Sequence, residues 1–218
     1  MSATSHSGPP PAEPPFTGHS WPVDVAGLTV DLPIVAIKPD FAISLMMVID
    51  LGVRFGTHIG QKLAERLAPL EPEVVVGAAT LGIPVAIETS RALGLDDYVI
   101  LQKSPKLHLA NALTRPIRSI TSQGEQRLLL DRRALPLLKG RRTVLVDDVV
   151  ASGGSLVGAL ALARAAGADV VGIGMILTEA HDWRAALGAD AGLVHGLAHI
   201  PQFEPDGAGW RPIPASLG

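Results

Sequence analysis

The chain has 218 residues, of which 47% are hydrophobic, 4% aromatic and 18% charged, with a formal net charge of −3 and no cysteine. The length predicts one domain, and the lack of cysteine excludes a disulfide scaffold, a zinc–thiolate site and a cysteine nucleophile. A mildly acidic chain with few aromatic residues is a poor candidate for binding polymeric nucleic acid. The abundance of Ala, Val, Leu and Ile favours a layered α/β core.

Residues 1–22 are rich in proline, and we expect a disordered tail there. The tail lacks the basic start and apolar centre of a signal peptide. The most apolar run, residues 41–53, is too short to cross a bilayer and contains Asp50. We therefore expect a cytoplasmic protein with no contact to a membrane, in which residues 23–218 form a single domain.

Residues 41–67 have helix-like spacing, and Gly52, Gly56 and Gly60 recur every four residues within them. A stripe of glycines on one helix face indicates either close packing of the helix against a sheet or a break in the helix.

Four apolar runs have the continuous character of buried parallel strands: Val74–Val76, Tyr98–Leu101, Thr143–Val146 and Val170–Leu177. Helices are predicted between them, at Pro84–Leu93 with Gly94 as its stop and at Ser155–Ala166 before Gly167. Alternation of strand and helix predicts an α/β fold, an open and mostly parallel sheet with helices on both faces.

Two segments depart from this alternation. The extended runs Ile117–Thr121 and Gln126–Leu130 flank the turn sequence of residues 122–125, which predicts an antiparallel hairpin above the sheet. A further strand is expected near Leu193–Leu197, in a C-terminal stretch rich in Gly and Pro.

The segment from Val144 to Ser155 carries the chemistry. It runs from a buried strand into the adjacent carboxylates of Asp147 and Asp148, then through a loop of small residues into a helix. The carboxyl ends of parallel strands face the ligand crevice of an open α/β sheet. Two acids there suit the vicinal hydroxyls of a ribose or a hydrated magnesium ion.

The loop that follows offers glycines, two hydroxyls and the free amides of a helix start, which together form a cradle for a phosphate. No lysine follows the glycines, so the loop is not a P-loop, and the glycine spacing does not match the dinucleotide-binding fingerprint.

This segment resembles the signature of the type I phosphoribosyltransferases. The resemblance implies that the two aspartates hold the ribose hydroxyls of phosphoribosyl pyrophosphate. It also implies that the loop binds the 5′-phosphate through Ala151, Ser152, Gly153, Gly154 and Ser155.

Two further blocks resemble the same family. Val74–Pro84 is similar to its pyrophosphate loop, which assigns Ala79, Thr80, Leu81 and Gly82 to the leaving group. Gln102–His108 is similar to its Arg-Lys-x-x-Lys block, with Gln102 in place of the arginine. That block assigns Lys103, Lys106 and His108 to pyrophosphate, gives Lys106 a catalytic role beside Asp147 and Asp148, and makes residues 103–131 a flexible loop over the site.

The layout most resembles the adenine and xanthine enzymes, because residues 103–107 are close to Lys-Pro-Gly-Lys-Leu. The pyrophosphate loop lacks the Glu-x-Arg-Gly pattern of the adenine enzyme, however, and Gly82–Ala86 and His108 are closer to orotate enzymes. In the family a hood covers the base. We expect it from residues 23–45 and the C-terminal segment, with Phe41 and Val149 as candidate contacts to the base.

The resemblance therefore implies a homodimeric enzyme that uses Mg²⁺, held mainly through the substrate and not by direct protein ligands. The enzyme joins phosphoribosyl pyrophosphate to a purine base, with adenine as first choice and xanthine or hypoxanthine next. Two alternatives stay open: an orotate phosphoribosyltransferase, and a regulator that senses the donor without catalysis.

Charge is distributed unevenly along the chain. Ten of the 18 Lys and Arg residues lie between positions 102 and 142, with two acidic residues among them, which gives that segment a net charge of +8. This segment includes the block assigned to pyrophosphate, so the acidic average is compatible with one small, highly phosphorylated substrate.

Overall fold

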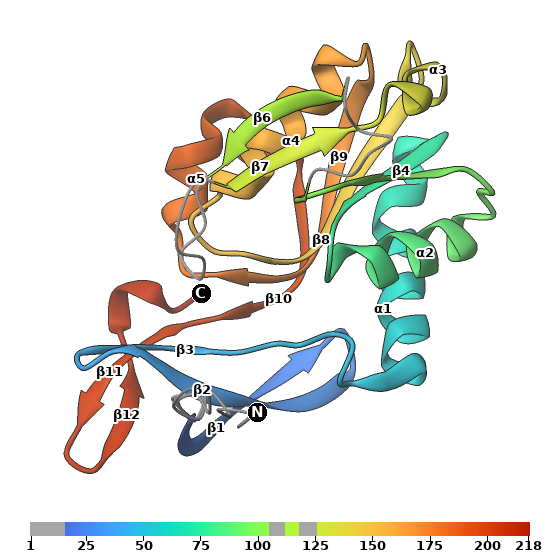
Figure 1. The fold of residues 1–218 in the computed structure, drawn as a ribbon. Coiled ribbons are helices and arrows are strands. Elements are labelled where there is room, and N and C mark those ends of the chain that lie inside the picture. Colours follow the sequence, from blue (N-terminus) through green and yellow to red (C-terminus); the bar gives the residue numbers. More distant parts are fainter. Residues whose placement is uncertain (1–15, 105–111, 118–125) are drawn as a thin grey trace, which may run out of the picture.

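The computed structural model describes residues 16–104, 112–117 and 126–218. Its centre is a parallel sheet with the strand order β10-β9-β8-β4-β5 (Figure 1). The strands are β4 (Val74–Ala78), β5 (Tyr98–Leu101), β8 (Arg142–Val150), β9 (Asp169–Glu179) and β10 (Val194–Ile200). All four predicted apolar runs and the C-terminal strand are confirmed.

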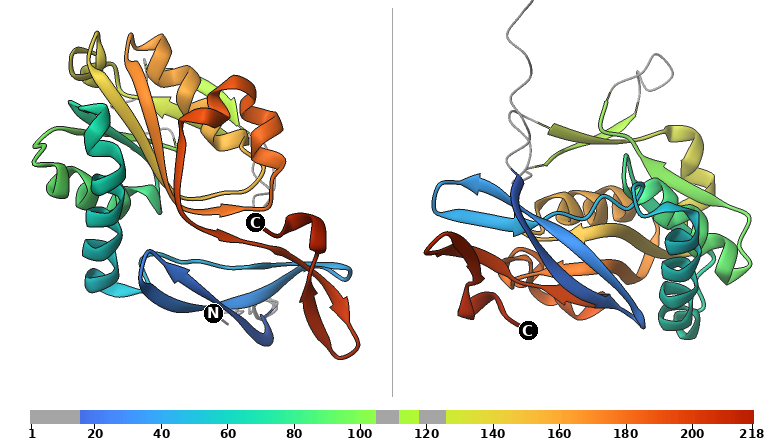
Figure 2. Two further views of the ribbon diagram at one scale, coloured as in Figure 1. Left: turned by 180° about the vertical axis from the view of Figure 1, so that it is seen from behind. Right: turned by 90° about the horizontal axis from the view of Figure 1, so that it is seen from below.

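Helices cover both faces of this sheet (Figure 2). One face carries α1 (Gly52–Leu67) and α2 (Gly82–Leu93), and the other carries α3 (Leu135–Leu138), α4 (Gly154–Ala165) and α5 (Asp182–Leu187). Neighbouring strand residues point to opposite faces, so Val75 packs in the core under α1 and α2, whereas Val74 and Val76 pack under α4. The predicted α/β class is confirmed.

Two features of the region 41–67 differ from the prediction. The helix begins at Gly52, whose φ of +77° is left-handed, and residues 41–51 are not helical. Gly60 faces α2, where an added Cβ would lie 2.6 Å from backbone atoms of Glu88. Of the three glycines, Gly60 therefore permits close approach of two helices and not of a helix and the sheet, whereas the predicted break corresponds to Gly52, where α1 begins.

A second, antiparallel sheet lies below the first in Figure 1 and is built from both ends of the described chain. Its order is β1-β2-β3-β11-β12, with β1 (Phe16–Val25), β2 (Leu28–Lys38), β3 (Phe41–Ser44), β11 (Gln202–Asp206) and β12 (Gly209–Pro212). The central strand β3 buries Ala42, Ile43 and Ser44. A short central strand such as β3 does not alternate between polar and apolar residues. Its sequence can therefore not be told apart from the start of a helix.

The predicted tail of residues 1–22 is too long, because residues 16–22 belong to β1. Trp21 and Pro22 pair with Leu32 and Asp31 of β2, and the Trp21 ring packs edge-on against Phe203 at 5.4 Å. Strand β1 is at the edge of its sheet, where a proline can be accommodated without breaking a ladder on both sides.

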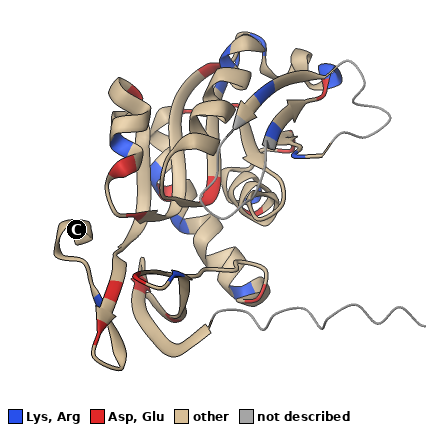
Figure 3. Ribbon diagram, turned by 60° about the vertical axis from the view of Figure 1, so that its left-hand side comes forward, with Lys and Arg blue, Asp and Glu red and all other residues tan. Residues whose placement is uncertain are grey.

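The predicted hairpin is present as β6 (Leu113–Ile117) and β7 (Gln126–Leu130), an antiparallel pair whose first strand lies earlier than predicted. The backbone of Gln102 exchanges two hydrogen bonds with Leu129, which ties the hairpin to the end of β5. Leu128 and Leu130 are fully buried in the core under the hairpin. The hairpin also carries Arg115 and Arg127 (Figure 3). None of the helices in the described part of the chain is long and apolar enough to cross a membrane.

Candidate functional site

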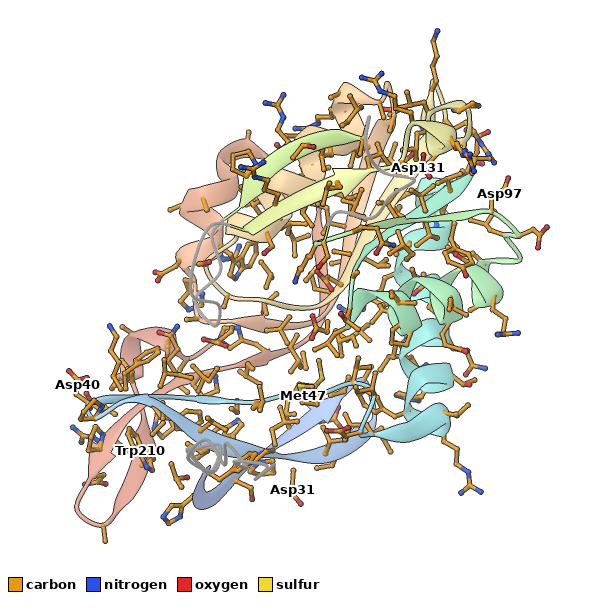
Figure 4. All side chains as sticks on the ribbon, viewed as in Figure 1. Asp31, Asp40, Met47, Asp97, Asp131 and Trp210 are labelled. Carbon is orange, nitrogen blue, oxygen red and sulfur yellow. The ribbon has the colours of Figure 1, made fainter. Side chains whose placement is uncertain are left out.

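A cavity of about 360 Å³ lies at the carboxyl ends of β4, β8 and β9. This is the edge at which open α/β sheets bind ligands. Residues that follow β3 close its other side, and Figure 4 labels one of them, Met47, at the junction of the two sheets. The lining consists of residues 43–47, 78–81 and 147–156 together with Lys103, Met175 and Glu179.

The predicted diacid lies on the wall of this cavity, near the end of β8. The Asp148 backbone N–H donates to Asp147 Oδ1 at 3.0 Å. Burial, followed by the charge of Asp148, raises the pKa of Asp147 well above its ordinary value, and burial likewise raises the pKa of Asp148. The Lys103 ammonium acts in the opposite direction on both pKa values. Two poorly solvated carboxylates side by side form a strong acceptor site for hydroxyl groups or a cation.

Gly82, the first residue of α2, lies close to the side chain of Asp147. A Cβ added at Gly82 would lie 2.7 Å from Asp147 Oδ1, so the glycine leaves the space that the carboxylate occupies. Gly82 itself is not part of the cavity lining. Gly82 therefore lies behind the diacid as seen from the cavity. The sequence resemblance, in contrast, assigns Gly82 to contact with the leaving pyrophosphate.

This contact yields a prediction. Replacing Gly82 with alanine should force the Asp147 side chain to turn and should weaken donor binding by about tenfold, because small displacements of a positioned group are costly. Titration calorimetry with phosphoribosyl pyrophosphate measures the change. Gly56→Ala is the matched control, since its Cβ would meet Glu88 Cγ at an ordinary 3.7 Å. Equal donor affinity in the two variants would contradict the role given to Gly82.

The loop after β8 also lines the cavity, as predicted for a phosphate cradle. Gly153 has a φ of +79° and precedes α4. No side chain caps the start of α4, so its first N–H groups are free of a side-chain acceptor. The residues concerned are Ala151, Ser152, Gly153, Gly154 and Ser155, all in the lining. The helix start can therefore donate backbone hydrogen bonds to an anion in the cavity.

On the opposite wall, Ala79, Thr80 and Leu81 line the cavity between β4 and α2, and Lys103 lies just beyond β5. The Ala79 N–H donates to Leu101 O at 2.8 Å, which fixes the start of this loop against the neighbouring strand. The structure thus brings together residues 79–81 of the predicted pyrophosphate loop and Lys103 of the predicted lysine block. Lys106 and His108 lie outside the described residues.

The two residues considered for contact with the base have different positions. Val149 lines the cavity, whereas Phe41 is not part of the lining. Phe41 begins β3 and pairs with Lys38 of β2, so the strand carries it away from residues 43–47. The residues of this segment that do reach the cavity begin at Ile43.

Sequence reasoning missed two buried residues that line the cavity, Ser44 at the end of β3 and Glu179 at the end of β9. Glu179 ends β9 and accepts a hydrogen bond from Gln202 Nε2 at 3.0 Å. Burial raises the pKa of Glu179. The signal was available, because Glu179 follows the apolar run Val170–Leu177 with one residue between them, much as Asp147 follows the run Thr143–Val146. Ser44 gave no signal, since its region was interpreted as helix.

Comparison with known proteins agrees with this geometry. Residues 54–192 match the family model described as the phosphoribosyl transferase domain. A xanthine phosphoribosyltransferase of Brevibacillus brevis is 31% identical over 150 residues, covering 68% of this chain and 76% of the relative. An adenine phosphoribosyltransferase of Rhodospirillum centenum is 32% identical over 117 residues, covering 54% of this chain and 65% of the relative.

The fold agrees as well. The crystal structure of adenine phosphoribosyltransferase from Thermoanaerobacter pseudethanolicus superimposes with a TM-score of 0.64 at 19% identity, covering 77% of this chain and 95% of that one. The chain therefore belongs to the phosphoribosyltransferase family and has its type I fold.

Proposed function

We propose that this protein transfers the phosphoribosyl group of phosphoribosyl pyrophosphate to a purine base, releasing pyrophosphate and a nucleoside monophosphate. One observation carries the proposal: a single cavity is lined by the diacid of β8, the free start of α4 and the loop of residues 79–81 with Lys103. These are acceptors for ribose hydroxyls, donors for a phosphate and a cation for a polyphosphate, in the arrangement that such a donor needs.

The reaction breaks the bond between the anomeric carbon and a pyrophosphate oxygen and joins that carbon to a ring nitrogen of the base, whose N–H proton passes to the pyrophosphate or to solvent. The protein's part is to position the groups and to stabilise charge. In this proposal Asp147 and Asp148 hold the ribose and face positive charge that develops on its ring, and residues 151–155 hold the 5′-phosphate. Lys103 and residues 79–81 receive the leaving pyrophosphate, with Lys106 and His108 assigned to the same task by sequence resemblance.

The residues of the cavity fit a magnesium ion that arrives with the substrate. Carboxylate oxygens are suitable ligands, and Asp147 and Asp148 supply them. Among the described residues, no group of three or more His, Cys, Asp or Glu side chains is arranged to hold a metal. In this proposal such an ion takes its remaining ligands from oxygens of the substrate, and when bound it would neutralise charge on the pyrophosphate.

Among purines we place adenine first and xanthine or hypoxanthine next. The Glu179 carboxyl group on the cavity wall favours a neutral base with N–H groups and disfavours an anionic one, because a like charge in a poorly solvated site is costly. Orotate carries a carboxylate and therefore ranks below the purines. A cytoplasmic homodimer stays a prediction.

The test is a panel of six bases: adenine, guanine, hypoxanthine, xanthine, orotate and uracil. Each is incubated with phosphoribosyl pyrophosphate and magnesium, and pyrophosphate release is measured. We expect turnover with one or two purines, and loss of turnover when a chelator removes magnesium. Turnover with orotate alone would contradict the purine assignment, and donor binding without turnover on any base would indicate a regulator.

A further inference from the structure

The proposed function assigns no role in donor binding to two buried polar side chains on the cavity wall. Ser44 and Glu179 are each 3% exposed, and both line the cavity with the diacid and the phosphate cradle. Ser44 ends β3 of the antiparallel sheet, whereas Glu179 ends β9 of the parallel sheet. The cavity thus has polar groups from each sheet where the two sheets meet.

Both side chains have unused capacity for hydrogen bonds. Ser44 Oγ has no hydrogen-bond partner within the described part of the chain. Glu179 Oε1 accepts one bond from Gln202 Nε2 at 3.0 Å, and a carboxylate has room for about four. A buried polar group without partners is unfavourable, so natural structures rarely keep one without a ligand or water to satisfy it.

The surrounding contacts hold the two groups in place. The backbone of Gln202 pairs with Ile43, the residue before Ser44, in the β3–β11 ladder. Gln202 N–H donates to Ser216 Oγ at 2.9 Å, so the residue that holds Glu179 is itself anchored to the C-terminal segment. Glu179 and Ser44 are therefore linked through one residue of β11, and their positions are fixed together.

We propose that Ser44 and Glu179 select the base. Glu179 accepts an N–H of the base, and the Ser44 hydroxyl pairs with the next polar atom along the same edge. The class of substrate is a neutral nucleobase with an N–H donor beside an acceptor, which includes the amino-pyrimidine edge of adenine and the lactam edge of hypoxanthine. This inference rests on the proposed function and extends it to particular side chains.

The decisive variants are Glu179→Gln and Ser44→Ala. Glutamine keeps the size of Glu179 and a carbonyl oxygen for Gln202 Nε2, but it presents N–H groups to the base in place of an acceptor. We expect the KM for the base to rise about tenfold or more in Glu179→Gln and about fivefold in Ser44→Ala, with the KM for phosphoribosyl pyrophosphate unchanged. A purely structural role would alter the melting temperature and leave the KM for the base as it is.

Ser90→Ala is the matched control, because Ser90 Oγ is also buried without a partner in the described chain but does not line the cavity. It should leave both KM values unchanged. An unchanged KM for the base in Glu179→Gln and Ser44→Ala overturns the inference. If the wild type turns over no base, saturation-transfer NMR tests whether it binds adenine or hypoxanthine. Binding that is weakened in both variants supports the inference about the base, although the proposed reaction fails. Absence of binding overturns both the inference and the proposed function.

Discussion

Replacing both Asp147 and Asp148 with asparagine is expected to remove donor binding while making the unliganded protein more stable at neutral pH. Two charge-assisted hydrogen bonds are lost, which corresponds to roughly 10²- to 10⁴-fold in affinity for phosphoribosyl pyrophosphate. Titration calorimetry with the donor and magnesium measures the affinity, and thermal melting across a pH series measures the stability.

The stability effect follows from the raised pKa values of the two carboxyl groups. A group whose pKa is higher in the folded than in the unfolded protein binds protons more tightly when folded. Its contribution to stability is therefore present at low pH and is lost as pH rises from the ordinary value near 3.8 through the raised one. At pH values above the raised pKa values, the buried carboxyl groups oppose folding, and asparagine of the same shape removes that penalty.

Asp96→Asn with Asp97→Asn is the matched control, since these are also adjacent aspartates but exposed and before β5. Asp97 lies far from Met47 at the other end of the parallel sheet (Figure 4). The control should leave donor affinity as in the wild type and should not raise the melting temperature. Wild-type affinity in the Asp147/Asp148 variant would remove the assignment of the ribose site.

Replacing Gly153 with alanine is expected to damage the phosphate cradle and the stability of the fold together. The residue has a φ of +79°, and a Cβ there would lie 2.9 Å from Ala186 Cβ and 3.2 Å from Trp183 Cα. The left-handed backbone and the crowding together cost about 2–4 kcal/mol of unfolding free energy. Donor affinity should fall by about tenfold or more, because the loop that presents its N–H groups must shift. Urea denaturation and calorimetry measure the two effects.

Gly94→Ala separates backbone strain from crowding. Gly94 has a similar φ of +73° at the end of α2, a Cβ added there would meet no atom within 4 Å, and the residue does not line the cavity. The substitution should cost about 1 kcal/mol of stability and leave donor affinity unchanged. If Gly153→Ala lowers the unfolding free energy and the donor affinity no more than Gly94→Ala does, the close packing of the phosphate cradle against α5 does not contribute to donor binding.

The parallel sheet and the donor site could be predicted because the information is local in the sequence. A strand buried on both faces is a continuous apolar run, and β4, β5, β8 and β9 each show one. The diacid lies near the end of β8 and the small-residue loop follows the strand directly, so the strand, the acids and the helix start form one continuous stretch of sequence. The placement of Asp147, Asp148 and residues 151–155 on one cavity follows from that order.

The antiparallel sheet could not be predicted in the same way, because its strands come from distant parts of the chain. β3 pairs with β2 on one side and β11 on the other, and its four residues have no periodicity that separates strand from helix. Ser44 and its place on the cavity depend on that pairing. The role of Gly82 depends on the distance between α2 and β8, which no spacing in the sequence reports.

The most direct test of the central claim is to identify the product. Wild-type protein is incubated with adenine, phosphoribosyl pyrophosphate and magnesium, and the mixture is analysed by mass spectrometry, with hypoxanthine and xanthine in parallel. The proposed function predicts adenosine monophosphate or the corresponding monophosphate of another purine, in amounts equal to the pyrophosphate released, and none with Asp147→Asn/Asp148→Asn. Donor binding by the wild type with no purine monophosphate formed from any of the three bases would contradict it.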